Sequence, residues 1–200
     1  TEVLTAQGFN VYKLLDGTQK QMDEAVRRFS EELAKSSAVG LFYFAGHGVQ
    51  VAGVNYLLPV DHAIQTEDDV KYSSLNVSAV LDKMGSARNG LNILILDACR
   101  DNPLPKSWSR SGTRGLGRID NSPQGTFIAF ATSPGDVAQD GSDGNGLFTK
   151  HLISAMKTPD RELELVFKDV LKSVRDESGN RQVPWTSSSF YGDFRFQEAK

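Results

Sequence analysis

The amino-acid sequence predicts an α/β fold in which helices cover both faces of a mostly parallel sheet. Almost continuous apolar runs occupy residues 39–45, 91–99 and 125–131, and runs of this length are typical of strands buried on both faces. Segments with the i, i+3, i+4, i+7 spacing of amphipathic helices lie between or after them. Because strands that alternate with helices form parallel sheets, these observations favour one α/β domain.

The composition is that of a globular domain. The chain has 200 residues, of which 39% are hydrophobic and 24% charged, and its net charge is −3. No predicted helix carries a basic stripe, so we expect no nucleic-acid partner. No apolar run approaches the ~18 residues of a membrane span and no signal peptide opens the sequence, so we expect no membrane partner. The single cysteine excludes an internal disulfide and predicts a reducing compartment, with the cytoplasm as the localisation.

The first residues predict the end of one helix and then a strand. Residues 1–8 have the pattern of a helix tail with Gly8 at its C-terminal cap, and residues 9–12 (FNVY) predict a strand. Since a helix tail needs a beginning, we expect that an upstream piece is absent from this sequence.

The other predicted elements follow from periodicity and from turn residues. In chain order they are a helix capped by Thr18 with apolar residues at 22, 25, 26, 29 and 33, the strand at 39–45, a hairpin of residues 49–51 and 55–58 that leaves the main sheet, an acidic loop at 61–71, a short helix at 77–84 and the strand at 91–99. An exposed loop at 102–124, the strand at 125–131, a Gly/Asp-rich loop at 133–146, helices at 147–156 and 162–174 and a last strand at 192–196 complete the chain.

His47 and Cys99 are the residues that point to chemistry. Cys99 ends the strand at 91–99, and His47 follows the strand at 39–45, 52 positions earlier. Open α/β sheets bind ligands at the carboxyl ends of their strands, so both residues are expected at one edge. An imidazole lowers the pKa of a neighbouring thiol and later protonates a leaving amine, which predicts nucleophilic catalysis. The alternative is an inert core thiol.

The glycines beside His47 add to this prediction. Gly46 and Gly48 permit a sharp turn and the close approach of another segment. The amides of Gly48 and Cys99 are the expected oxyanion hole, because backbone N–H groups stabilise charge that develops on a carbonyl oxygen. The alternative is a histidine satisfied within a turn. Two ligands without a third make a poor zinc site, so no metal is expected.

Several motifs resemble those of a known family. Phe44-Ala-Gly-His-Gly48 and Leu96-Asp-Ala-Cys-Arg100 are similar to the motifs of the caspase and metacaspase family of cysteine peptidases, whose His precedes the Cys by ~50 residues. The motifs that resemble the bacterial branch, the orthocaspases, are residues 56–61 (YLLPVD), 97–103 (DACRDNP), 131–135 (ATSPG), 146–149 (GLFT) and 182–185 (QVPW). The resemblance implies a caspase-like three-layer α/β/α sandwich with a mostly parallel central sheet, the first strand of which is missing from this chain.

The resemblance also implies an activity. In a cysteine endopeptidase of this family, Cys99 is the nucleophile and His47 the general base and acid. Animal caspases carry Gln two residues before the Cys and cleave after Asp, whereas this chain has Asp97 there. A carboxylate pairs with a cationic side chain at P1, the residue before the cleaved bond, so cleavage after Arg or Lys is expected. The alternative for Asp97 is a strand-end residue that caps a turn.

Two further residues are candidates for the substrate pocket. Ser133 belongs to the strand end that lines the pocket in the family and pairs with substrate backbone, together with residues 131 and 132. Asp136 is a candidate for an acidic wall of the same pocket, and turn chemistry is its alternative explanation.

We expect one domain, residues 1–200, in which the resemblance implies three parts. They are a large-subunit-like part at 1–102 that lacks its first strand, an exposed basic linker at 103–124 and a small-subunit-like part at 125–200. The corresponding linker of the family is often self-cleaved, and the autoprocessing candidates here are Lys106, Arg110, Arg114 and Arg118. The alternative is a solvated charged loop.

The expected partners are peptide or protein substrates with a basic P1 residue and an N-terminal fragment that supplies the missing first strand. No cofactor is expected to be required. Calcium stays open, because some metacaspases need it while the acids at 136, 140 and 143 lack the EF-hand ligand order. The alternative to a peptidase is a catalytically silent caspase-like module that binds proteins through the same groove.

Overall fold

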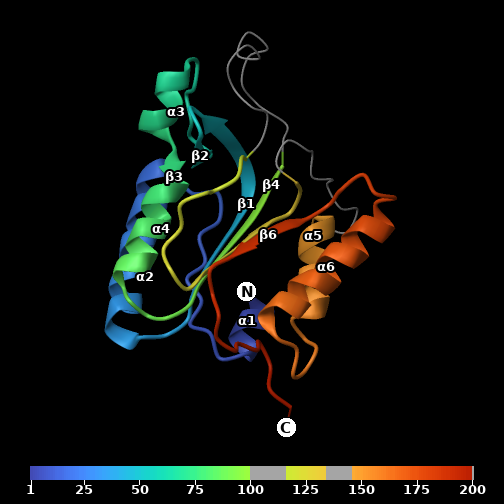
Figure 1. Ribbon diagram of the computed structural model, residues 1–200. Helices are drawn as coiled ribbons and strands as arrows, with labels where there is room; N and C mark the ends of the chain where they lie inside the picture. Colours follow the sequence, from blue (N-terminus) through green and yellow to red (C-terminus); the bar gives the residue numbers. More distant parts are fainter. Residues whose placement is uncertain (100–115, 134–145, 200) are drawn as a thin grey trace.

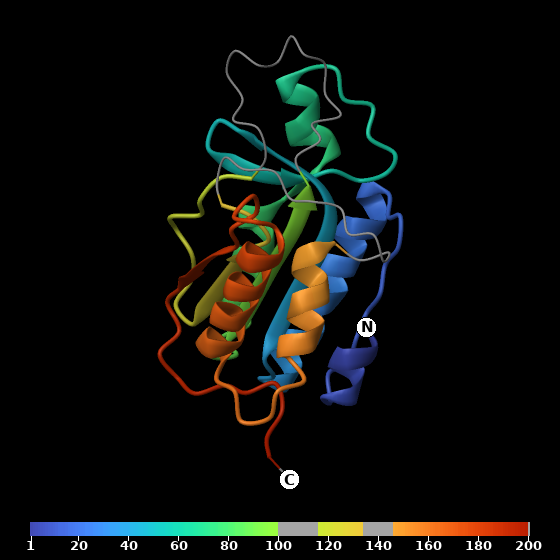
Figure 2. The ribbon, with the colours of Figure 1, turned by 90° about the vertical axis from the view of Figure 1, so that its right-hand side faces the viewer.

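The computed structural model describes residues 1–99, 116–133 and 146–199, and in these ranges a sheet lies between two layers of helices (Figures 1 and 2). The sheet has six strands in the order β3-β2-β1-β4-β5-β6. The strands are β1 (Gly40–Val51), β2 (Val54–Leu57), β3 (Leu75–Asn76), β4 (Asn92–Cys99), β5 (Thr126–Phe130) and β6 (Trp185–Ser188). The helices are α1 (Glu2–Ala6), α2 (Gln19–Ser36), α3 (Glu67–Ser73), α4 (Val77–Ser86), α5 (Leu147–Ala155) and α6 (Leu163–Glu177). None of the helices in this part of the chain is long and apolar enough to cross a membrane.

The apolar runs of the sequence form the inner strands, which are parallel as predicted. β1 pairs in parallel with β4, and β4 pairs in parallel with β5. The shorter strands β2, β3 and β6 pair antiparallel, so the complete sheet is mixed. The side chains of β4 from Ile93 to Leu96 are at most 1% exposed. Burial on both faces explains why this strand is apolar without alternation.

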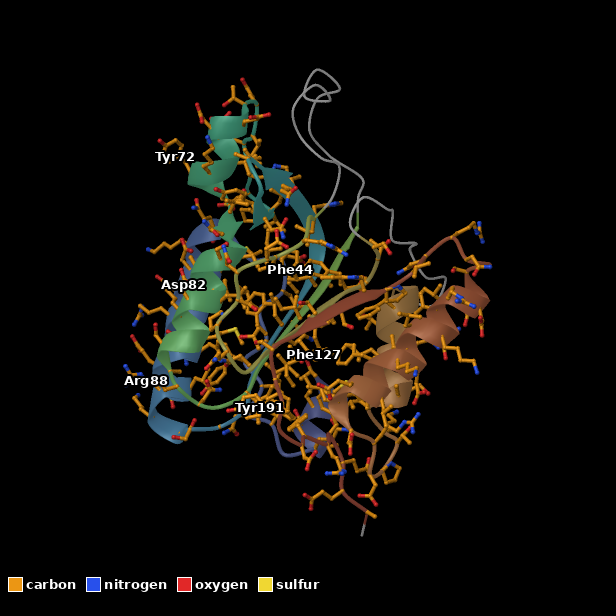
Figure 3. The ribbon with its side chains drawn as sticks, viewed as in Figure 1. Phe44, Tyr72, Asp82, Arg88, Phe127 and Tyr191 are labelled. Carbon is orange, nitrogen blue, oxygen red and sulfur yellow. The ribbon has the colours of Figure 1, made fainter. Side chains whose placement is uncertain are left out.

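Each face of the sheet has its own hydrophobic core. α2 and α4 cover one face with side chains such as Met22 and Leu81. α5 and α6 cover the other face, where the ring centroids of Phe127 and Phe167 lie 4.7 Å apart. Figure 2 shows α5 and α6 in front of the sheet and α2 and α4 behind it, and Figure 3 shows Phe127 in the interior. The predicted three-layer α/β/α sandwich is confirmed.

The prediction that the hairpin leaves the main sheet is wrong. β1 continues through His47 to Val51, and its last residues pair with β2 across the two-residue turn Ala52-Gly53. Both turn residues have positive φ, 50° and 80°, which matches the twist of a tight hairpin. The hairpin therefore extends the sheet beyond His47.

The strands predicted at 9–12 and 192–196 are also wrong. Residues 9–12 pair with no strand of the described ranges, and Phe9 packs instead on the core with its ring centroid 6.4 Å from that of Phe196. Arg195 makes only an isolated bridge with Glu162. The last strand is β6, whose sequence (WTSS) is too polar and too short to stand out, and its pairing with β5 creates it.

The acidic stretch at 61–71 contains a helix that the sequence prediction missed. α3 begins after Thr66, whose hydroxyl accepts a hydrogen bond from the N–H of Asp69. The Asp69 carboxylate in turn accepts hydrogen bonds from the N–H groups of Gln65 and Thr66. These bonds lower the pKa of Asp69, and the bond from Gln65 has the largest effect. A capping box thus converts an apparent loop into a first helical turn.

In the described ranges, residues 40–47 of β1 have a strand partner on one side only. From Gly40 to His47 its strand partner is β4, and β2 joins the other side from Gly48 onward. No strand within the described ranges covers that other side of residues 40–47. The side chains of Ala45 and His47, which share one face of the strand, are exposed. An uncovered strand of this kind is a site for the addition of a further strand.

Candidate active site

The backbones of His47 and Cys99 lie next to each other on neighbouring parallel strands. The register pairs His47 of β1 with Cys99 of β4, and Ala45 with Asp97. Neighbouring strands are about 4.8 Å apart, so the structure brings these two predicted catalytic residues together at the carboxyl end of β4. The side chain of Cys99 lies outside the described part of the structure. The His47 side chain is exposed, and the backbone carbonyl of His47 accepts a hydrogen bond from the N–H of Leu58 at 2.9 Å.

The glycines that flank His47 serve packing, because β1 continues past them and makes no turn there. Gly46 has a φ of 156°, and an added Cβ would lie 2.9 Å from Cζ of the Phe44 ring. Gly48 is buried, and an added Cβ would lie 2.7 Å from Cδ2 of Leu116. The predicted close approach of another segment therefore occurs at Gly48, while the predicted turn is wrong.

Asp97 is a buried carboxylate beside the first turn of α5. Asp97 is 7% exposed, and its Oδ2 accepts a hydrogen bond from Oγ1 of Thr149 at 2.5 Å. α5 begins after Gly146, where an added Cβ would lie 3.3 Å from Asp97 Oδ2. Since the N-terminus of a helix carries partial positive charge, this environment suits an ionised carboxylate.

Thr149 contacts Asp97 and Tyr43 contacts Thr149, and neither residue was a candidate from the sequence. The hydroxyl groups of Tyr43 and Thr149 are 2.6 Å apart, so a chain of polar contacts links β1, α5 and β4. Tyr43 is hidden in an apolar strand run, and Thr149 lies in a family motif that carried no assigned chemistry. The available signal was a small hydroxyl side chain in the first turn of a helix that follows a Gly-rich loop.

The chain after β5, where Ser133 lies, is held by residues 182 and 183. Ser133 Oγ donates a hydrogen bond to the Val183 carbonyl at 2.9 Å. The Ala131 N–H donates to the Leu96 carbonyl at 3.0 Å, and the Ala131 carbonyl accepts from Nε2 of Gln182 at 2.8 Å. Both backbone groups of Ala131 are thus engaged within the domain. Asp136 lies outside the described residues.

Of the four autoprocessing candidates, the structure describes Arg118, and Lys106, Arg110 and Arg114 lie outside the described residues. Cζ of Arg118 lies 5.0 Å from the ring centroid of Trp185, which is a cation–π contact. Ahead of it, Gly117 exchanges hydrogen bonds with the side chain of Asn55, and Leu116 covers Gly48. The end of the linker is therefore docked on the sheet.

The described residues contain no obvious metal centre. Within residues 1–99, 116–133 and 146–199, no three His, Cys, Asp or Glu side chains gather closely enough to hold a metal ion. The acids at 136, 140 and 143 lie outside these ranges.

Comparison with known proteins identifies the family of the chain. A family model described as "Caspase domain" (Peptidase_C14) matches residues 1–195. The chain is 28% identical over 182 residues to mucosa-associated lymphoid tissue lymphoma translocation protein 1 of Homo sapiens, and 28% identical to the homolog from Mus musculus. Each match covers 87% of this chain and 20% of the relative, so the chain spans a fifth of the length of these curated relatives. From the match over residues 1–195, the chain belongs to the caspase domain family of peptidases.

Proposed function

We propose that this domain is a cysteine endopeptidase that cleaves peptide bonds after Arg or Lys. The observation that carries the proposal is the register of β1 and β4, which sets His47 opposite Cys99 and leaves the buried Asp97 two residues before Cys99. The family membership supports a peptidase, and the Cys-His pair and the basic specificity are our additions to it.

In this mechanism the thiolate of Cys99 attacks the carbonyl carbon of the substrate. A C–S bond forms while the π electrons of the carbonyl move to its oxygen, and the N–H groups of Gly48 and Cys99 donate hydrogen bonds to that oxyanion. His47, which has taken the thiol proton, gives it to the leaving amine as the C–N bond breaks. Water then hydrolyses the thioester with His47 as the base, and the thiol is restored.

The surroundings of His47 support these roles. Its imidazole is accessible to substrate and water, while its backbone is held on one side by β4 and on the other by the hydrogen bond from Leu58. Gly48 is buried, so its amide belongs to a fixed part of the strand. A rigid backbone keeps a general base and an oxyanion donor at constant separation, which is what acyl transfer requires.

Asp97 is the proposed anchor for the P1 cation. A buried carboxylate gains strongly from a hydrogen-bonded cation, because little water competes for its charge. Arg offers two parallel N–H donors to a carboxylate, whereas Lys offers a compact point charge. Ser133 and Asp136 are proposed as further parts of the pocket wall.

We further place the domain in the orthocaspase branch, with a cytoplasmic location, no required cofactor and self-processing in the loop at 103–124. The proposed strand partner is an N-terminal fragment that pairs with residues 40–46, on the side that no described strand covers and before the hydrogen bond from Leu58 to His47. The edge that no described strand covers supports that partner, because such an edge is a template for the addition of a strand.

Hydrolysis of fluorogenic peptides tests the proposal. The wild-type domain cleaves a peptide with Arg at P1, and Cys99→Ala and His47→Ala each lower kcat by more than about 10³-fold. His62→Ala, which removes a histidine with no proposed role, is the matched control and keeps the activity. A preference for Asp over Arg at P1 would overturn the role of Asp97. Absence of turnover with every basic peptide would overturn the peptidase itself and leave a silent binding module.

A further inference from the structure

Asp97 is held by a hydrogen-bonded chain with a fixed direction. Thr149 Oγ1 donates its only proton to Oδ2 of Asp97 at 2.5 Å. Thr149 Oγ1 also lies 2.6 Å from the phenolic oxygen of Tyr43. Since the threonine proton is already used, the Tyr43 hydroxyl is the donor to Thr149. The chain of donors therefore runs from Tyr43 through Thr149 to the carboxylate.

Three different elements of the fold contribute to this chain. Tyr43 lies in β1, Thr149 in the first turn of α5 and Asp97 in β4. β1 and β4 are fixed to each other by their register, and α5 is fixed by buried side chains such as Phe148 and Leu152. The hydroxyl of Thr149 is therefore held in place, and its bond to Oδ2 is one of the contacts that orient the Asp97 carboxylate.

We propose that Thr149 and Tyr43 are positioning residues that make the P1 site selective for Arg over Lys. This inference rests on the proposed function, in which Asp97 binds the P1 cation. A guanidinium pairs with a carboxylate through two coplanar N–H donors, so its binding depends on the orientation of the carboxylate plane. An ammonium is a point charge with rotatable donors and depends much less on that orientation.

The nearby start of α5 strengthens the effect of the chain. An added Cβ at Gly146 would lie 3.3 Å from Asp97 Oδ2, so the helix terminus lies close to the carboxylate. The partial positive charge of the terminus favours the ionised carboxylate whatever its orientation. Removal of the Thr149 hydroxyl therefore takes away one bond that orients the Asp97 carboxylate and leaves the helix terminus in place, which separates orientation from charge.

Thr149→Val is the decisive variant, because valine keeps the shape of threonine and lacks the hydroxyl. We expect kcat/KM for an Arg-P1 peptide to fall about tenfold, mostly through KM, the size of one lost charged hydrogen bond. The value for the matched Lys-P1 peptide falls no more than about threefold, so the Arg-to-Lys ratio drops. Thr149→Ser, which restores the hydroxyl, recovers most of the ratio. Tyr43→Phe also lowers the Arg-to-Lys ratio, by a smaller factor than Thr149→Val does.

Two surface substitutions are matched controls. Thr158 is exposed and follows the end of α5, and Tyr191 is 94% exposed. Thr158→Val and Tyr191→Phe both keep the wild-type Arg-to-Lys ratio of kcat/KM. Equal falls for the Arg and Lys peptides in Thr149→Val, with no recovery in Thr149→Ser, would show a merely structural role and overturn the inference. The same holds if neither Thr149→Val nor Tyr43→Phe changes the ratio. A wild-type domain that cleaves neither peptide would instead overturn the proposed function.

Discussion

The side chain of Asn55 holds both polar backbone groups of Gly117. Nδ2 of Asn55 donates to the Gly117 carbonyl at 2.7 Å, and the N–H of Gly117 donates to Oδ1 of Asn55 at 2.8 Å. Asn55 is buried in β2, while the next residue of the linker, Arg118, lies over Trp185 of β6. The linker end is therefore attached at two separate strands of the sheet.

This attachment predicts which basic residues are used in self-processing. Cleavage occurs after Lys106, Arg110 or Arg114 and not after Arg118, because Gly117 and Arg118 would have to leave Asn55 and Trp185 to become an extended substrate. Mass spectrometry of the wild-type chain against Cys99→Ala measures the new termini. A fragment that begins at residue 119 contradicts this prediction, and two intact chains contradict self-processing.

Asn55→Ala is expected to release the linker end. Loss of both hydrogen bonds leaves the polar groups of Gly117 without their partner and lowers the free energy of unfolding by about 1–3 kcal/mol. Arg118 then becomes a site for added trypsin. Limited proteolysis checks this, with the exposed Asn10→Ala as control. Equal rates of cleavage at Arg118 in the two variants would argue that the contact with Trp185 suffices.

Gly125→Ala is expected to be more destabilising than Gly53→Ala, although both glycines have positive φ. At Gly125 an added Cβ would lie 2.3 Å from the Gly90 carbonyl oxygen, which is backbone and cannot move aside easily. At Gly53 nothing lies within 4 Å, so only the strain of φ +80° remains. We expect a loss of about 1 kcal/mol for Gly53→Ala and at least about 3 kcal/mol for Gly125→Ala. Chemical denaturation measures both, and similar losses would show that the sheet relaxes around Gly125.

The cap of α3 predicts a pH dependence of stability. Hydrogen bonds from Gln65 and Thr66 lower the pKa of Asp69, so the folded state favours the ionised carboxylate. The contribution is present above the ordinary aspartate pKa of about 4 and is lost as the pH falls through the lowered value. Thermal unfolding from pH 7 to pH 2 should therefore show a gap between wild type and Asp69→Asn that closes in acid. Asp82→Asn, on the surface of α4 (Figure 3), is the control for the loss of an exposed carboxylate.

The sequence predicts the strands that are buried on both faces, because burial leaves a continuous apolar run. β4 is the clearest case, since Ile93–Leu96 is at most 1% exposed. Strands that depend on a neighbour are harder to predict. Residues 9–12 alternate like a strand and make none within the described ranges, while the polar β6 is a strand because β5 pairs with it. Local pattern describes the first kind of strand, and tertiary pairing decides the second.

The candidate site divides in the same way. His47, Cys99 and Asp97 could be predicted because their chemistry and their position at strand ends are visible in the sequence. Thr149 could not, because its role depends on α5 packing against the face of β4 that carries Asp97. Tyr43 was hidden for the opposite reason, since an aromatic residue in an apolar run is ordinary in a strand.

The pairing of β1 with β4 makes the position of His47 opposite Cys99 depend on the other end of these strands, where Gly40 pairs with Asn92. At Gly40 an added Cβ would lie 2.6 Å from Oδ1 of Asn92 and 2.8 Å from Cδ2 of Leu33, so these side chains would have to shift to admit one. A slip of β1 by one residue would set His47 against Ala98 and exchange the two faces of the strand. A side chain at residue 40, about 23 Å along the strand from His47, is therefore expected to disturb the pairing that sets His47 opposite Cys99 without touching either residue.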